Sequence, residues 1–183
     1  LVFLAIGFGN ISEESVSQGG SSDLITTGIN MTSGHVAEAL MILANNLQEH
    51  GVPLPELLPP TLRRFAGNEN PAIRALILRR LPDLQSQDLE LGWALFCCAT
   101  QDAARIWQFA EPCLYHTYRD HFEEVAVSLE RILQGGSKED METWGRISAL
   151  SALSTRSDFA SLLIELGTLD VTDAWKGAAS VWT

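Results

Sequence analysis

The sequence is poor in cysteine and in basic residues, and it has no long apolar run. Its 183 residues include 3 cysteines, Cys97, Cys98 and Cys113. So sparse and odd a set does not form a disulfide framework, and it predicts a reducing, cytoplasmic setting. No apolar stretch approaches the roughly 18–20 residues that a membrane-spanning helix needs, so we expect no membrane association. Lys and Arg total 12 against 23 Asp and Glu, and a net charge of −11 disfavours a nucleic-acid partner.

The familiar catalytic motifs are also missing. The chain has no G-x-x-x-x-G-K-[ST] phosphate-binding loop, no G-x-S-x-G nucleophile turn and no H-E-x-x-H string. Each motif supplies groups that its chemistry requires at that spacing: backbone N–H groups for phosphate, a strained serine, or two imidazoles on one helix face. The sequence therefore predicts no catalytic residue, no cofactor and no resident metal.

The residues that are present predict an all-α fold. Hydrophobic residues make up 46% of the chain and charged residues 19%, a balance that can bury a core. Val36, Leu40, Leu43 and Leu47 recur at helical spacing, and no segment alternates in the manner of a strand. Pro82 should end a helix and Pro112 should kink or break one. The expected helices are 33–50, 54–66, 71–81, 87–100, 102–118, 120–134, 137–153, 158–166 and one from 173.

The N-terminal part differs in composition from the rest. Residues 1–8 are apolar, whereas residues 10–23 are rich in Ser, Glu and Gly. We interpret residues 1–26 as the end of a preceding helix followed by a flexible loop. Residues 27–183 then form helical repeats that continue in a longer protein.

A short string recurs at a nearly constant spacing. V-A-E-A-L ends at Leu40, A-I-R-A-L at Leu76 and R-I-S-A-L at Leu150. The first interval is 36 positions and the second is 74, or two steps of 37, which places a missing member near Leu114. A weaker member, G-A-A-S-V, ends at Val181. A period of about 35–40 residues with two helices per unit predicts a solenoid of antiparallel helix pairs, and an irregular helix bundle is the alternative.

Several strings resemble known helical repeats. N-E-N-P-A-I-R-A-L, residues 68–76, is similar to the HEAT-repeat pattern, which implies a right-handed α-α superhelix. The wider chain resembles the helical-repeat region of large bacterial signal-transducing P-loop NTPases, several of which act in antiphage defence. I-N-M-T-S-G-H-V-A-E-A-L (29–40), H-F-E-E-V-A-V-S-L-E-R-I-L (121–133) and W-K-G-A-A-S-V-W (175–182) carry this likeness. It covers roughly residues 27–183, and the NTPase itself would lie elsewhere in the polypeptide.

The resemblance implies structural roles for a few residues. Asn30 and Gly34 match the family's I-N-x-x-x-G string, and Arg74 occupies the arginine of the HEAT pattern. The chain departs from the family at Ser33, where an arginine is usual, and at Trp175, which stands before Lys176. A salt bridge from that missing arginine is therefore not expected here.

The best candidates for contact with a partner are basic residues in one part of an acidic chain. Residues 61–80 hold five of the 12 basic residues and one acidic residue. Arg63, Arg64, Arg79 and Arg80 are the predicted binding residues, facing a protein partner or another domain of the same polypeptide. The alternative is that these side chains only cover helix faces with their stems.

A competing hypothesis assigns chemistry to three other residues. Cys113, His116 and His121 lie close in sequence, and thiolates and imidazoles are zinc ligands. A small helical metal protein or enzyme is thus the alternative function, although the spacing matches no zinc finger. The leading hypothesis is a non-catalytic helical-repeat scaffold.

Overall fold

The computed structural model describes residues 21–101, 106–154 and 159–182 of the chain. Helices and no strands make up the regular structure of these ranges, which confirms the all-α prediction. The chain divides into two compact units, residues 1–102 and 103–183. None of the helices in the described ranges combines the length and apolarity required to cross a bilayer.

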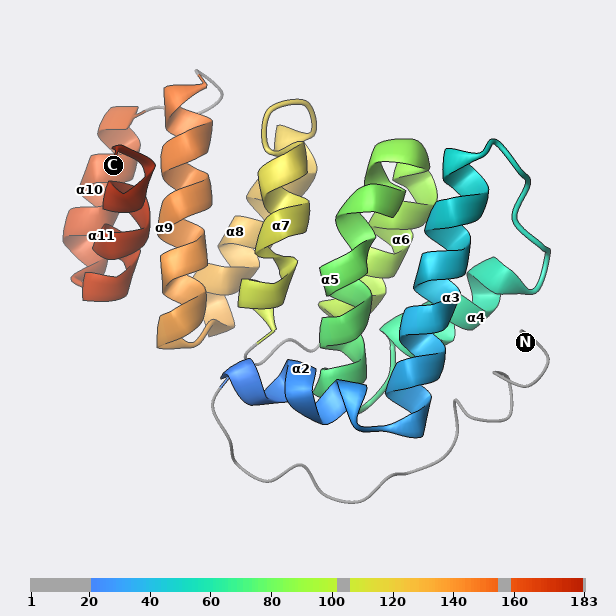
Figure 1. Ribbon diagram of the computed structural model, residues 1–183. Coiled ribbons are helices and arrows are strands. Elements are labelled where there is room, and N and C mark those ends of the chain that lie inside the picture. The colour runs from blue at the N-terminus through green and yellow to red at the C-terminus, as the bar shows by residue number, and fades with distance from the viewer. Residues whose placement is uncertain (1–20, 102–105, 155–158, 183) are drawn as a thin grey trace. The chain divides into compact units, whose positions relative to one another are not determined.

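Five helices make up the part of the N-terminal unit that the structure describes. They are α2 (Ser21–Ile29), α3 (Thr32–Glu49), α4 (Leu58–Ala66), α5 (Pro71–Gln87) and α6 (Leu89–Ala99). Helix α5 packs beside α3 and α6, and α4 packs against α6, while α2 lies across the N-terminal ends of α3 and α5 (Figure 1). Because α5 is surrounded, residues 72–78 are buried without interruption. This agrees with the apolar circumference that its sequence shows.

The beginning of this unit differs from the sequence-based expectation. Residues 21–26 were expected in a flexible loop, but they open α2. The helix is held by close approaches that a local pattern does not reveal. A side chain at Gly28 would lie 2.9 Å from the carbonyl oxygen of Ala72, and one at Gly34 would overlap the carbonyl oxygen of Gly28. Glycine at both positions therefore lets α2 contact α3 and α5 at backbone distance.

Helix α5 also differs from its expected extent. Its start is as predicted, because the Asn70 side chain caps it by accepting from the N–H of Ala72 at 2.9 Å and Pro71 follows in the first turn. Its end is not, since the helix passes through Pro82 and continues to Gln87. Leu81 and Leu84 are fully buried on either side of the proline. Their burial offsets the missing backbone hydrogen bond.

The C-terminal unit is built around one central helix. Its elements are α7 (Trp107–Thr117), α8 (Phe122–Gly135), α9 (Lys138–Leu153), α10 (Phe159–Leu169), α11 (Thr172–Ala179) and a 3-10 turn, η1 (Ser180–Trp182). Helix α9 packs against α7, α8, α10 and α11 (Figure 1). Ser137 caps it as predicted, in a capping box with Asp140. Helix α7 continues through Pro112.

Side-chain bonds between helices join residues about one repeat apart. In the N-terminal unit Arg80 pairs with Glu38 at 2.9 Å over 42 positions, and Gln48 donates to Asp88 over 40 positions. In the C-terminal unit Thr143 donates to Glu111 over 32 positions, and Arg146 reaches Glu111 and Ser180 over 35 and 34. Most of these bonds connect each helix with the next but one along the chain.

Helix α11 and the turn η1 each expose a large aromatic side chain. Trp182 is 53% exposed and Trp175 is 43% exposed. Trp107 and Trp144, in contrast, are buried in the core of the same unit.

Candidate functional site

The four predicted binding arginines are not equivalent in the structure. Arg63 and Arg79 are exposed, on α4 and α5, whereas Arg64 and Arg80 are half-buried. Arg80 donates from Nε and Nη2 to the Glu38 carboxylate, at 3.2 and 2.9 Å. Its guanidinium is therefore committed to joining α5 to α3, which leaves Arg63 and Arg79 as the members that present a charge to solvent.

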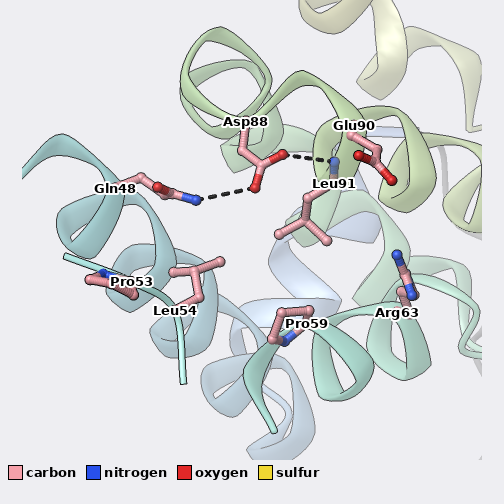
Figure 2. Close-up of a pocket in the computed structure, with 8 residues that line it drawn as sticks. All are labelled: Gln48, Pro53, Leu54, Pro59, Arg63, Asp88, Glu90 and Leu91. Atoms are coloured by element: carbon pink, nitrogen blue, oxygen red, sulfur yellow. Dashed lines mark hydrogen bonds between the residues drawn. The ribbon is translucent and has the colours of Figure 1, made fainter. Parts of the chain in front are cut away.

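Arg63 lines a surface hollow of about 320 Å³ (Figure 2). The other lining residues come from the end of α3, the segment before α4, α4 itself and the start of α6: Gln48, Pro53, Leu54, Pro59, Asp88, Glu90 and Leu91. Arg63 lines the hollow from α4, and Glu90 and Leu91 line it from α6 (Figure 2). The hollow therefore has an apolar floor of proline and leucine with charges of both signs at its edge.

Asp88 holds one wall of this hollow in place. One carboxylate oxygen accepts from the N–H of Leu91 at 3.0 Å and so caps α6, and the other accepts from Gln48 Nε2 at 3.2 Å. Both oxygens are thus used within the protein, and the cap ties the C-terminal end of α3 to the start of α6. Arg63 and Glu90 make no ion pair with any described residue.

The lining residues define what the hollow can do chemically. Its described lining residues supply a guanidinium, two carboxylates and an amide, and none of them is Ser, Cys, His, Lys or Tyr. A nucleophile with an adjacent base, the minimum for covalent catalysis, is therefore not found among these residues. Apolar contact with charged pairing at the rim suits binding of a polypeptide surface.

The predicted structural residues occupy helix junctions of the N-terminal unit. Asn30 Nδ2 donates to the carbonyl of Thr26 at 2.9 Å at the end of α2. Gly34 lies where α3 meets α2. Arg74 is buried within α5 and is only 9% exposed. Gly34 and Arg74 therefore lie where helices pack, whereas Asn30 is exposed in the turn between α2 and α3.

Sequence reasoning did not single out Arg146, whose side chain bonds to two other elements of the C-terminal unit. It lies on α9 and donates to Glu111 on α7, to Glu142 one turn away at 2.8 Å, and to Ser180 in η1 at 2.9 Å. The signal was present, because Arg146 opens the R-I-S-A-L string. The string was used only for its spacing, and nothing local marks its arginine as a bridge.

The residues of the alternative metal hypothesis are not brought together. Cys113 is fully buried in α7, His116 is exposed one turn further on, and His121 precedes α8. Within the described ranges no three His, Cys, Asp or Glu side chains are grouped as a metal site would require. Burial raises the pKa of the Cys113 thiol well above its ordinary value, so the group is a neutral thiol at neutral pH.

The raised pKa of Cys113 predicts a loss of stability in alkaline solution. The native thiol stays protonated where the unfolded thiol, with an ordinary pKa of about 8.5, ionises. Stability from this group is therefore complete below about pH 8.5 and falls by up to about 1.4 kcal/mol per pH unit above it. We expect the free energy of unfolding of wild type to fall more steeply from pH 8.5 to 10.5 than that of Cys113→Ala. The free energy of unfolding is measured by urea denaturation at each pH. The same pH dependence for wild type and Cys113→Ala would contradict this expectation.

Comparison with known proteins finds no matching family model, no similar curated protein and no similar solved structure. The class of the molecule thus follows from its own fold: an all-helical protein of two units.

Proposed function

We propose that this protein is a non-catalytic helical-repeat scaffold, a right-handed superhelix of HEAT-like helix pairs that offers a surface to a protein partner. The observation that carries the proposal is that recurring strings and side-chain bonds relate each helix to the next but one along the chain. The recurring strings end at Leu40 in α3, Leu76 in α5 and Leu150 in α9, and Leu114 lies in α7. Together with interhelical bonds over 32 to 42 positions, this pattern is what stacked helix pairs produce.

The chemistry of the surface supports binding over catalysis. The hollow beside Arg63 combines an apolar floor with charged edges, and the described residues that line it include no nucleophile. We propose Arg63 and Arg79 as the predicted arginines that contact a partner, with Arg80 and Arg74 contributing to packing.

On the resemblance of the three strings, we further propose that the chain belongs to a larger cytoplasmic bacterial NTPase of the signal-transducing kind, in which it contacts a partner or another domain. The reading frame that encodes it tests this part of the proposal. A G-x-x-x-x-G-K-[ST] motif upstream would support it, and a frame of this same length would refute it.

Distances between spin labels test the scaffold architecture. Stacked helix pairs place alternate helices about 10 Å apart, so the separation from α3 should grow by about that amount at each step. We expect labels at Ala39→Cys and His116→Cys to be about 20 Å apart, and labels at Ala39→Cys and Lys176→Cys about 40 Å apart. These three positions are exposed.

The labelled proteins need a background without competing thiols. Cys97 is exposed and Cys98 is half-buried, so both become Ser, whereas buried Cys113 can remain. Double electron–electron resonance then gives both distances. An α3-to-α11 distance no longer than the α3-to-α7 distance would show a closed bundle and would overturn the scaffold proposal.

A further inference from the structure

A second concavity lies within the C-terminal unit, between α8 and α10 and above α9. Its volume is about 260 Å³, and its lining is mainly apolar. Phe122 and Leu129 line it from α8, Leu162 from α10, and Ser148 and Ser151 form part of its floor on α9. We call this feature the α8/α10 groove.

The groove exists because α9 carries small residues at positions where α5 carries large ones. Aligning the strings A-I-R-A-L and R-I-S-A-L places Ser148 opposite Arg74 and Ser151 opposite Ile77. Arg74 and Ile77 are both buried and fill space in the N-terminal unit. There α4 and α6 pack against each other, whereas α8 and α10 both pack on α9 with little direct contact between them.

Part of the groove floor needs no polar ligand. Ser151 Oγ donates to the carbonyl of Ile147 at 2.8 Å, so its hydroxyl is already satisfied within α9. Trp144, buried in the core, adds an aromatic side chain to the same floor. An apolar side chain can therefore cover Ser151 without leaving its hydroxyl unpaired.

The rim of the groove is acidic on both sides. Glu130 from α8 and Glu165 from α10 both line it and are exposed. Among the described residues, neither carboxylate has an ion-pair partner, and none of those that line the groove is basic. A ligand with cationic groups at both edges of an apolar face would complement this arrangement.

We propose that the α8/α10 groove binds one basic amphipathic helix of a protein partner. The walls are helices whose backbone groups are already paired, so they offer no edge for an extended peptide. The ligand must satisfy its own backbone, as a helix does. Its apolar residues, spaced i, i+3, i+4 and i+7, enter the groove, and Lys or Arg on the flanks pair with Glu130 and Glu165. This inference rests on the scaffold function and names the class of partner.

A model peptide tests the proposal on the whole chain. The probe is a fluorescein-labelled helical peptide with leucines at the spacing above and lysines on the flanks, and its affinity is measured by fluorescence anisotropy at physiological ionic strength. One comparison peptide has the same composition in scrambled order, and another has Gln in place of Lys. We expect the amphipathic lysine peptide to bind at least ten times more tightly than either.

Matched variants separate the groove from general attraction to an acidic protein. Glu130→Lys with Glu165→Lys should weaken binding at least ten-fold. The control, Glu49→Lys with Glu124→Lys, makes the same change in net charge at exposed positions outside the groove, so its affinity should stay within two-fold of wild type. Ser148→Leu should also weaken binding, because it fills the floor without changing the charge.

Three results of the peptide-binding measurements would overturn the proposal. They are equal weakening by the two charge pairs, binding of the Gln peptide as tight as that of the Lys peptide, and absence of peptide binding to wild type. A second copy in the groove would instead appear as dimerisation in sedimentation velocity that Ser148→Leu abolishes, which also overturns it. If circular dichroism shows that Ser148→Leu is unfolded, the comparison of the two double charge-reversal variants still tests the proposal. If the groove proposal fails, the spin-label distances can still agree with the scaffold proposal, so the two failures are distinguishable.

Discussion

Replacing Gly145 or Gly177 with alanine is expected to destabilise the C-terminal unit by about 3 kcal/mol or more. Helices α9 and α11 approach each other at these two glycines. A Cβ at Gly145 would overlap the carbonyl oxygen of Ala174, and one at Gly177 would overlap that of Glu142. Both obstacles are backbone atoms, so no rotation of a side chain relieves them and the helices must separate. Thermal denaturation followed by circular dichroism should show a melting temperature lower by roughly 6–12 °C.

Gly167 provides the control, because it lies within α10 and a Cβ there would meet nothing within 4 Å. Gly167→Ala should raise stability by about 0.5–1 kcal/mol, since alanine lowers the backbone entropy lost on folding. The opposite signs separate the close approach from helix propensity, which favours alanine at all three positions. A melting temperature for Gly145→Ala equal to or above that of wild type would refute the helix crossing.

Replacing Arg146 with methionine is expected to cost about 2 kcal/mol of stability. The change keeps most of the apolar stem but removes bonds to α7 and η1, and it leaves Glu111, whose side chain is 20% exposed, without its cationic partner. A double-mutant cycle with Glu111→Gln, measured by urea denaturation, should give a coupling energy above about 1 kcal/mol. Additive losses would show that the pair does not act as a bridge.

The salt bridge of Arg80 with Glu38 is the matched comparison. It also joins two alternate helices, but the Arg80 side chain is 38% exposed and its guanidinium bonds to one carboxylate, that of Glu38. Arg80→Met should therefore cost less than about 1 kcal/mol, because water screens an exposed pair. An equal loss of stability for Arg146→Met and Arg80→Met would mean that the number of partners and the burial of the side chain do not determine how much each arginine stabilises the fold.

Local patterns sufficed where the decisive interactions lie within a few residues. The caps at Asn70 and Ser137, the proline after Asn70 and the helical spacing of apolar residues all act over one or two turns. The helices they begin were therefore predictable. Helices α4 and α7 were exceptions, because they start at Leu58 and Trp107 rather than near residues 54 and 102.

The predicted helix boundaries were wrong where contacts with residues distant in sequence determine the structure. Pro82 does not end α5, because Leu81 and Leu84 are buried by neighbouring helices and that burial outweighs the local preference. Residues 21–26 form part of α2 for a similar reason, because Gly28 allows α2 to pack closely against α5. Neither interaction can be recognised in a short window of sequence.

The candidate sites show the same division. Spacing alone pointed to Arg63 but could not show that Arg80 is engaged with Glu38, or that Cys113 and His116 face different surroundings. By itself the sequence determined the helical class, most helix starts, the acidic charge and the recurrence of the string, because these depend on composition and on neighbours within a turn or two. The tertiary structure alone decided which glycines bring helices together, which arginines are committed to partners and where small serines leave a groove, because each depends on what a distant part of the chain places against that residue.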